Sequence, residues 1–380
     1  MPYPSQKWWG VKKEQARSNM VIAKVTIEQE LAMTIVTLEL PKVNNIEAGR
    51  PKHCRYCEGE TFQRWGGTIK RVRDPQFDEV IVYRYRCCRC RRTFRHYPEG
   101  VDRASQTKRM RVLAAIQWLL GMSYRGSSLF LSGFGIVLRR MSIWRDVQAR
   151  RGQLEKEKYW KPVRVMGVDG AYVRGWGKTQ PVLVCVDMGT GQPVTVGYVD
   201  EKDPQAVKKF LEPLVQRLGV SVIVTDDLFS YKQVADQLQL EHQICQFHVR
   251  RWVGKTLHEL KEKLPTEEVG KVDDIKAILQ DLPIEGDKRL IALYRQLPAS
   301  QMGKLGGEYT PMEQLRYLII RLAENWARFR VFDWQKDVPW TNNPTEQAIG
   351  RMKMRARTVR GYKTWSGMAS GLMVAGVGVA

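Results

Sequence analysis

The middle of the chain narrows the folding possibilities most, because short apolar runs bounded by Gly or Pro follow one another there. Three such runs, each of strand length, occupy residues 163–173, 181–191 and 192–200. Residues 203–219 then place apolar side chains at helical spacing, and a fully apolar run follows at 220–226. Bounded apolar runs are typical of strands, and a run without polar positions is typical of a strand buried on both faces. The pattern predicts three antiparallel strands, a crossover helix and a buried parallel strand.

The next residues extend this α/β pattern. Residues 231–239 are predicted to form a helix, and residues 242–247 a short strand. An antiparallel meander joined through a helix to parallel strands resembles an RNase H-like core. The predicted fold class is therefore α/β, with an RNase H-like mixed sheet.

Two carboxylates fall at informative places on these strands. Asp169 lies on the first strand, and Asp226 ends the fourth, which such a core places beside the first. Asp227 competes with Asp226, and Asp187 on the second strand is a further alternative. Strand alternation favours Asp226, because two valines at alternate positions before it share its face. A carboxylate at a strand end beside an apolar layer is a natural cation ligand, although such an Asp is also common as a turn residue.

A third acid, Glu346, opens the strongly basic segment 341–363. Alone, a Glu in such a segment is often an ion-pair partner. Between Asp226 and Glu346, apolar residues recur at helical spacing in several segments, which predicts an all-helical insertion at about 255–335. If the fold brings Asp169, Asp226 and Glu346 together, they can hold two magnesium ions, with the basic residues after Glu346 close to a phosphate backbone.

The cysteines before residue 100 have the spacing of a metal site. They form the pairs Cys54-x-x-Cys57 and Cys87-x-x-Cys90, and two such pairs are typical of tetrahedral thiolate coordination of one structural zinc ion. Cys88 is an alternative to Cys87 as a ligand, and His53 and His96 are less regular substitutes. Alternation within 77–88 places Ile81, Tyr83 and Tyr85 on one face of a strand. A zinc ribbon is predicted for residues 47–100.

Residues 101–155 follow as a basic helical unit. Helical spacing predicts helices at 107–120 and 124–133 and a third that starts at Ser142. Helix, turn and helix resemble a helix-turn-helix module, whose last helix enters the major groove of DNA. The third helix would expose toward DNA its residues Arg145, Gln148 and Arg151, with Ile143 and Val147 packed inward.

Charge favours a polyanionic partner. The 380 residues carry a formal net charge of +22, which points to nucleic acid. No apolar run reaches the roughly 20 residues that span a bilayer, so no membrane partner is expected. The first residues have no apolar signal core, which predicts a cytoplasmic location. Residues 1–46 are left unassigned.

Taken together, these residues resemble the DDE transposases of bacterial and archaeal insertion sequences, especially the group similar to Mutator-like elements. That group has a helical insertion between its second Asp and its Glu, and a Cys or Asp, two residues and a His after the second Asp, as in Cys245-Gln246-Phe247-His248 here. The pair Asn342-Asn343 before Glu346 and the pair Gly361-Tyr362 also match. The resemblance covers residues 160–370. It departs after Asp169, where Gly170 and Ala171 stand in place of the Glu or Thr of many relatives.

The resemblance implies a function. Residues 160–380 would form a catalytic domain in which Asp169, Asp226 and Glu346 bind two Mg²⁺ ions, or Mn²⁺ in their place, with Cys245 and His248 as a supporting motif rather than metal ligands. The reactions would be strand cleavage and 3′-OH strand transfer, with double-stranded DNA of the element ends and the target as partner and a homodimer on DNA at the nucleoid. The basic side chains expected to contact that DNA are Arg351, Lys353, Arg355, Arg357 and Arg360. The alternatives are a structure-selective nuclease or resolvase with the same core, and a zinc-ribbon DNA-binding regulator without catalysis.

Overall fold

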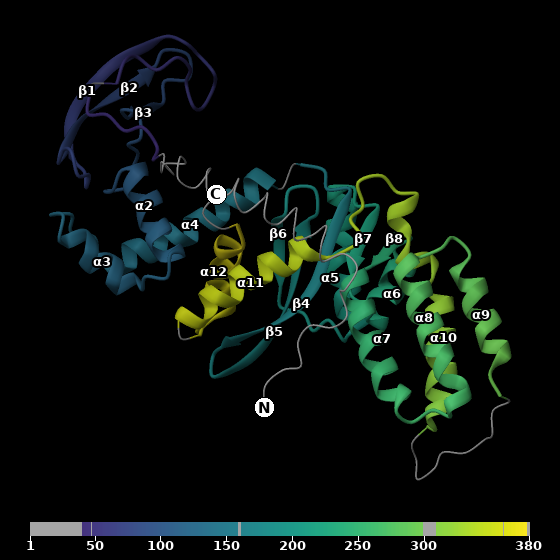
Figure 1. Cartoon of the computed structure of the whole chain (residues 1–380). Coiled ribbons are helices and arrows are strands. Elements are labelled where there is room, and N and C mark those ends of the chain that lie inside the picture. The colour runs from purple at the N-terminus through teal and green to yellow at the C-terminus, as the bar shows by residue number, and fades with distance from the viewer. Residues whose placement is uncertain (1–39, 47, 159–160, 299–308, 360, 378–380) are drawn as a thin grey trace, which may run out of the picture.

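A computed structural model describes residues 40–46, 48–158, 161–298, 309–359 and 361–377. Most of the unassigned N-terminal segment therefore lies outside the described residues. A three-stranded sheet lies at one end of the molecule and a group of long helices at the other, with a five-stranded sheet between them (Figure 1). No helix among the described residues has the length and apolar character needed to cross a membrane.

The central sheet confirms the predicted fold class. Its strands are β4 (Val165–Gly175), β5 (Lys178–Asp187), β6 (Gln192–Gly197), β7 (Val222–Thr225) and β8 (Glu241–Ile244). They lie in the order β6-β5-β4-β7-β8. The pairs β4–β5 and β5–β6 are antiparallel, whereas β7 runs parallel to β4 and β8 parallel to β7. This is the mixed sheet of an RNase H-like fold.

Alternating residues of the strands face two helical layers. On β5, Leu183 and Cys185 pack against α5 (Pro204–Leu218) and α6 (Phe229–Gln237). The intervening valines of β5 face α11 (Asn343–Thr358) and α12 (Trp365–Val377). Since successive strand residues point to opposite faces, a run without polar positions is what a sheet covered on both sides requires.

The helical insertion follows β8 directly. It comprises α7 (Gln246–Lys261), α8 (Val269–Asp281), α9 (Gly286–Gln296) and α10 (Pro311–Glu324), with short 3₁₀ turns at Thr266–Glu268, Ala327–Phe329 and Val331–Asp333. These helices share an apolar core of their own. The predicted strand 242–247 is too long, because β8 ends at Ile244 and Cys245 caps α7. The motif Cys245-x-x-His248 is therefore the first turn of a helix.

The N-terminal sheet is an antiparallel meander of β1 (Phe62–Arg71), β2 (Glu79–Cys87) and β3 (Thr93–His96). Ile81, Tyr83 and Tyr85 occupy alternate positions of β2 as predicted; the two tyrosines are buried, whereas Ile81 is exposed. The β1–β2 register shifts between Arg64 and Gly67, opposite the tyrosines. Val80 and Val82 pack with Val72 and Val101, whereas Tyr83 and Tyr85 pack with the cysteines, so the two faces of β2 are covered at different ends of the strand.

Three helices connect this meander to the central sheet: α2 (Lys108–Leu119), α3 (Tyr124–Ser132) and α4 (Arg140–Lys158). The Ser123 side chain caps α3 by accepting a hydrogen bond of 2.9 Å from the backbone N–H of Gly126. Ile143 and Val147 of α4 are fully buried, as the helical spacing predicts. Val147 packs with Trp118 of α2 and Val374 of α12, and this contact attaches the helices α2–α4 to the face of the central sheet that α12 covers.

Candidate active site and zinc site

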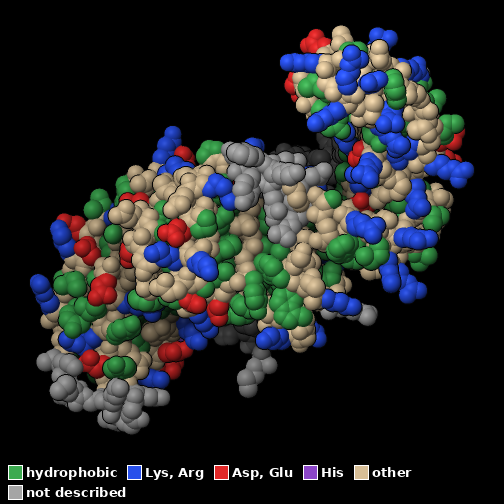
Figure 2. Space-filling view, turned by 180° about the vertical axis from the view of Figure 1, so that it is seen from behind, with side chains coloured by type: hydrophobic (Ala, Val, Ile, Leu, Met, Phe, Trp, Pro, Cys, Tyr) green, Lys and Arg blue, Asp and Glu red, His purple; other side chains and the backbone are tan. Residues whose placement is uncertain are grey.

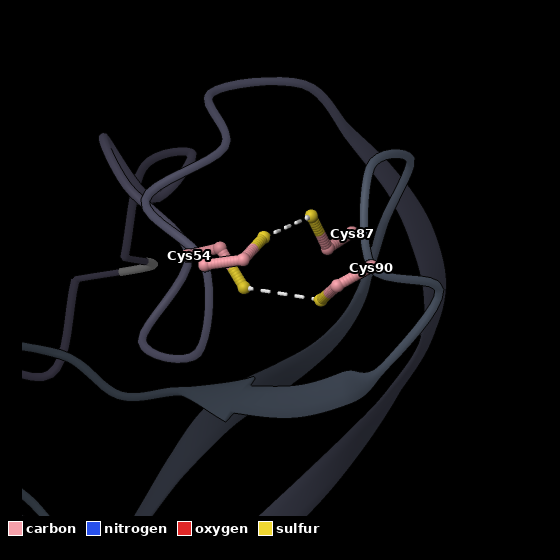
Figure 3. Close-up of side chains that lie close together, drawn as sticks. Cys54, Cys87 and Cys90 are labelled. Carbon is pink, nitrogen blue, oxygen red and sulfur yellow. Dashed lines mark hydrogen bonds between the residues drawn. The ribbon is translucent and has the colours of Figure 1, made fainter.

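Four cysteines of the N-terminal sheet converge (Figure 3). Their sulfur atoms all lie within 4.8 Å of one another in the group Cys54, Cys57, Cys87 and Cys90. The Sγ atoms of Cys54 and Cys90 are 3.7 Å apart, and those of Cys57 and Cys87 are 3.6 Å apart. Tetrahedral zinc with Zn–S bonds of about 2.3 Å requires sulfurs about 3.8 Å apart. The cluster can therefore bind zinc, and the alternatives Cys88, His53 and His96 lie outside it.

The two predicted aspartates lie side by side on adjacent strands. Gly167 of β4 pairs with Val224 of β7, so Asp169 and Asp226 follow two residues further along parallel strands. Burial, together with the charges of Asp226 and Glu201, raises the pKa of Asp169 to about 7. Burial and, to a smaller extent, the charge of Glu201 raise the pKa of Asp226 to about 6. The buried Oδ1 of Asp226 has no hydrogen-bond partner. The two side chains thus repel each other in a poorly solvated place.

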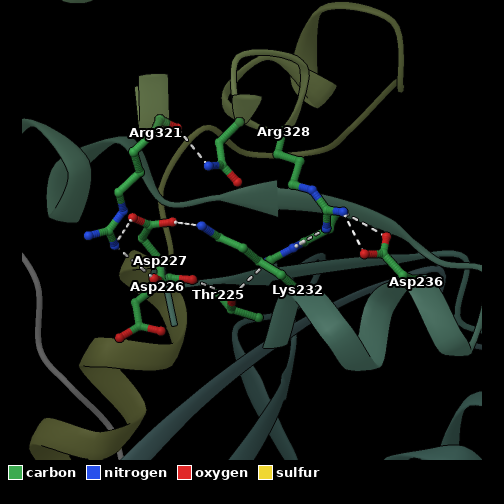
Figure 4. A network of polar contacts seen from close by, with 9 residues as sticks. Thr225, Asp226, Asp227, Lys232, Asp236, Arg321 and Arg328 are labelled. Atoms are coloured by element: carbon green, nitrogen blue, oxygen red, sulfur yellow. Dashed lines mark hydrogen bonds and ion pairs between the residues drawn. The ribbon is translucent and has the colours of Figure 1, made fainter. Parts of the chain in front are cut away.

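Asp227 has different surroundings (Figure 4). Its carboxylate forms ion pairs of 2.5 Å with Lys232 of α6 and with Arg321 of α10. The Asp227 side chain is 5% exposed, so both charges are needed to compensate its burial. Asp187, the other alternative, accepts hydrogen bonds from Gly189 N–H and Thr190 in the turn after β5. Protein groups therefore already bind the carboxylates of Asp227 and Asp187, whereas the carboxylate of Asp226 is available for a ligand.

A chain of hydrogen bonds fixes the end of β7. Arg328 donates to Nδ1 of His242 at 3.0 Å, so Nε2 of that ring carries the proton and donates to Thr225 Oγ1 at 2.8 Å. Thr225 in turn donates to the backbone carbonyl of Asp226 at 2.7 Å. Burial, with the charge of Arg328, lowers the pKa of His242 to about 3, which keeps the ring neutral. The backbone of Asp226 is thereby held from the side of the helical insertion.

Asn342 brings Glu346 to the same place. Its Nδ2 donates to the carbonyl of Val168 on β4, and its backbone N–H donates to Sγ of Cys245, each at 3.2 Å. Asn342 is fully buried and starts α11, with Glu346 in the first turn. Gly167 permits this close approach, because a Cβ there would lie 2.1 Å from Thr345 Oγ1. The residues 341–346 therefore dock the start of α11 on the strand that carries Asp169.

His248 is the common neighbour of the three predicted acids. Its Nε2 lies 3.6 Å from Oε1 of Glu346. A hydrogen bond with Cys245 raises the pKa of His248 to about 9, with smaller contributions from Glu346 and Asp169. The charge of His248 in turn counteracts the rise in pKa of both aspartates. The structure thus gathers the three acids around one imidazole.

The possible ligand atoms of Cys245, His248 and Glu346 all lie within 4.8 Å of one another. Burial raises the pKa of Cys245, but hydrogen bonds from His248 and from backbone groups outweigh this effect and lower it. Among the described residues, the three acids do not themselves form so tight a group.

Sequence reasoning missed Glu201. This residue lies in the connection between β6 and α5, and its charge acts on both aspartates. The connection contains three acids, Asp200, Glu201 and Asp203, and no periodicity distinguishes one from another. The only signal in the sequence was Gly170, one of the two residues after Asp169 at which this chain departs from many transposases of the resembled group.

Basic side chains after Glu346 divide into two sets. Lys353 and Arg357 are exposed on α11. Arg351 donates to the carbonyl of Gly376 at 2.7 and 2.9 Å. Arg355 is 3% exposed, donates to the carbonyl of Met122 at 2.9 Å and lies 4.1 Å from the ring centre of Trp118. The prediction that Arg355 contacts DNA is therefore wrong, because its guanidinium joins α11 to the helical unit. Arg360 lies outside the described residues.

On the helical unit, Arg145 of α4 is exposed and Gln148 is partly exposed, whereas the Arg151 side chain lies outside the described part of α4. Arg145 borders a hollow of about 570 Å³ with three other arginines, Arg125, Arg139 and Arg140. Figure 2 shows Lys and Arg side chains gathered on the lobe formed by β1–β3 and α2–α4. This lobe offers an electropositive surface to a polyanion.

Comparisons with known proteins agree with this architecture. A protein of insertion element ISM1 from Methanobrevibacter smithii, described as an uncharacterized 48.3 kDa protein, is 23% identical over 204 residues. This match covers 51% of the chain and 50% of the relative, so the chain spans about half the length of the curated relative.

Retroviral integrase core domains are among the similar solved structures. The bovine immunodeficiency virus core is 18% identical, with 40% of this chain and 92% of that chain covered and a TM-score of 0.19. A dimeric HTLV-2 core in complex with magnesium is 16% identical, with 41% and 97% covered and a TM-score of 0.20. Because these TM-scores are low, the fold assignment depends on the strand order instead.

The sequence model of the IS66 family of transposases matches residues 177–370, which is half of the chain. These residues include β5–β8, the helical insertion and α11. The prediction of an insertion-sequence transposase is confirmed: the chain belongs to the IS66 transposase family.

Proposed function

We propose that the chain binds the ends of an insertion sequence, cleaves DNA strands there in a metal-dependent reaction, and joins the 3′-OH ends to target DNA. The observation that carries the proposal is the gathering of Asp169, Asp226 and Glu346 around His248 by β4, β7 and α11. Membership of the IS66 transposase family and the match to an insertion-element protein support it.

The residues present fit Mg²⁺, or Mn²⁺ in its place. Magnesium prefers carboxylate oxygens, and buried oxygens of Asp226 and Glu346 have no hydrogen-bond partner. A divalent cation would relieve the repulsion that raises the pKa of Asp169 and of Asp226. When bound, two such ions supply an activated water or 3′-hydroxyl and stabilise the leaving oxygen of the displaced strand. The four-cysteine cluster fits one structural Zn²⁺ ion.

The protein itself positions the DNA. Lys353 and Arg357 follow Glu346 on the exposed side of α11, where they would neutralise the phosphates next to the reacting one. Arg145 and Gln148 of α4 would bind the element end. We place the zinc ribbon at 47–100, the DNA-binding unit at 101–155 and the catalytic domain at 160–380, acting as a homodimer on DNA at the cytoplasmic nucleoid. Two chains would pair two element ends.

The test is a joining assay with element-end DNA labelled beside its terminal 3′-OH, in Mg²⁺ and with a target duplex. The wild-type chain should cleave and then produce labelled joined product. Asp226→Asn and Glu346→Gln should abolish both steps and retain DNA binding, with Asp187→Asn as a control of equal charge change and full activity. Cleavage without joined product would favour a nuclease, and variants that function like the wild type would favour a regulator.

A further inference from the structure

Glu201 is held in place by two residues that stand four and five positions after Asp226. The hydroxyl of Tyr231 donates to Oε2 of Glu201 at 2.9 Å, and the Ser230 hydroxyl donates to the Glu201 backbone carbonyl. Tyr231 is fully buried, and both residues belong to the first turns of α6. Because side chain and backbone are both bound, the direction of the carboxylate is defined by the fold and not by solvent.

Gly170 makes the room that this carboxylate occupies. A Cβ at position 170 would lie 2.0 Å from Oε2 of Glu201 and 2.1 Å from its Cδ. The backbone of Gly170 is not among the left-handed glycines, so its conformation does not require glycine. The absence of a side chain next to Asp169 therefore has a steric reason, since it lets the Glu201 carboxylate approach β4.

The charges around Glu201 are unbalanced. Asp169 and Asp226 both interact with it electrostatically. Within the described parts of the chain, no Lys, Arg or His forms an ion pair with Glu201, in contrast to Asp227 nearby with its two cations. Three adjacent carboxylates that face only the charge of His248, which acts on the two aspartates, repel one another, and a fold that fixes them so has a cation as the natural complement.

We propose that Glu201 is a fourth carboxylate of the catalytic centre, and that it ligates, directly or through a bound water, the divalent cation held by Asp169 and Asp226. This inference rests on the proposed function. It assigns to Gly170 the role of clearing space for the ligand, and to Tyr231 the role of a positioning residue that holds Oε2 and leaves the second oxygen free.

The test is a titration of the chain with Mn²⁺ alone, followed by electron paramagnetic resonance of the free ion. Glu201→Gln should weaken Mn²⁺ binding at least about tenfold, the usual scale for removal of a group that ligates or orients a metal. Gly170→Ala should weaken it as well, because the added methyl displaces the carboxylate. The matched control is Glu262→Gln, a change of equal charge at an exposed residue of the helical insertion, which should bind Mn²⁺ like the wild type.

The outcomes separate this inference from the proposed function. If Asp169→Asn loses Mn²⁺ binding while Glu201→Gln and Gly170→Ala keep it, Glu201 is no ligand and the proposed function still holds. A wild-type chain that binds no Mn²⁺ contradicts both. Should Glu201→Gln fail to fold, as judged by its circular dichroism, Gly170→Ala and Tyr231→Phe decide, and unchanged Mn²⁺ affinity in both overturns the inference.

Discussion

Without metal, Asp169 should destabilise the folded chain at neutral pH. Its pKa is about 7 in the fold, against an ordinary value of 3.8. Between these values the folded state binds a proton that the unfolded state has lost, so the free energy of unfolding falls as pH rises from 4 to 7. Three pKa units correspond to roughly 4 kcal/mol. Burial of the charge is the largest part of this cost and repulsion from Asp226 the next. Asp169→Asn removes both, so it should stabilise the metal-free chain by about 2–4 kcal/mol at pH 7.5.

The assay is urea unfolding of both proteins in EDTA at pH 4.5 and 7.5. The stabilisation by Asp169→Asn should be present in full at pH 7.5 and about a quarter as large at pH 4.5, because most of the unfolded-state carboxyl, with its ordinary pKa of 3.8, is already ionised at the lower pH. Mn²⁺ at about 1,000 times its dissociation constant should then cancel or reverse this difference at pH 7.5, because it adds about 4.1 kcal/mol to the wild type alone. If Asp169→Asn is destabilising in EDTA at pH 7.5, or its effect is the same at both pH values, the reasoning is wrong.

The neighbouring Asp227 provides a matched control of opposite sign. Its carboxylate is buried and compensated by Lys232 and Arg321 at 2.5 Å each. Asp227→Asn leaves both cations without their partner and should destabilise the chain by about 3–5 kcal/mol, the usual cost of breaking a buried pair. If Asp169→Asn and Asp227→Asn changed the free energy of unfolding equally, the different surroundings of these two acids in the structure would be contradicted.

Three further predictions concern the zinc site, the docking of α11 and the basic surface. Cys57→Ser should lower the zinc content measured by atomic absorption from one ion per chain, whereas Cys88→Ser should leave it unchanged. Gly167→Ala should destabilise the chain by about 1–3 kcal/mol in urea unfolding through overpacking against α11, and should abolish joining. Lys353→Ala should reduce the slope of log affinity against log salt by about 0.9 in a DNA-binding titration. Arg355→Ala should leave that slope unchanged and instead lower the unfolding midpoint.

The strand order could be predicted from the sequence because the first four strands of the sheet lie in bounded, largely apolar runs. Val222–Thr225 of β7 are buried on both faces, and the register of β7 with β4 places Asp226 beside Asp169. The zinc cluster could also be predicted from the sequence, because the spacing of a CxxC pair is set by local loop geometry. These features depend on residues that are close in sequence or that repeat with a fixed period.

The remaining features depend on tertiary partners that no local pattern contains. Asp226 and Asp227 are adjacent in sequence, and only the positions of Lys232 and Arg321 separate their surroundings. The sequence predicts that Arg355 contacts DNA, and only the structure shows that its guanidinium packs against the ring of Trp118. Glu201 can approach β4 because Gly170 has no side chain, and this contact joins two segments that are not adjacent in sequence.

The central claim is that Asp169, Asp226 and Glu346 share one divalent metal site beside His248. Crystals soaked in Mn²⁺ and measured at the manganese absorption edge test it most directly, because anomalous difference density locates the ion without assumptions about chemistry. We expect density between these three carboxylates in the wild-type chain, and none there in Asp226→Asn. Manganese density at Asp227, or at none of the three acids, would contradict the account.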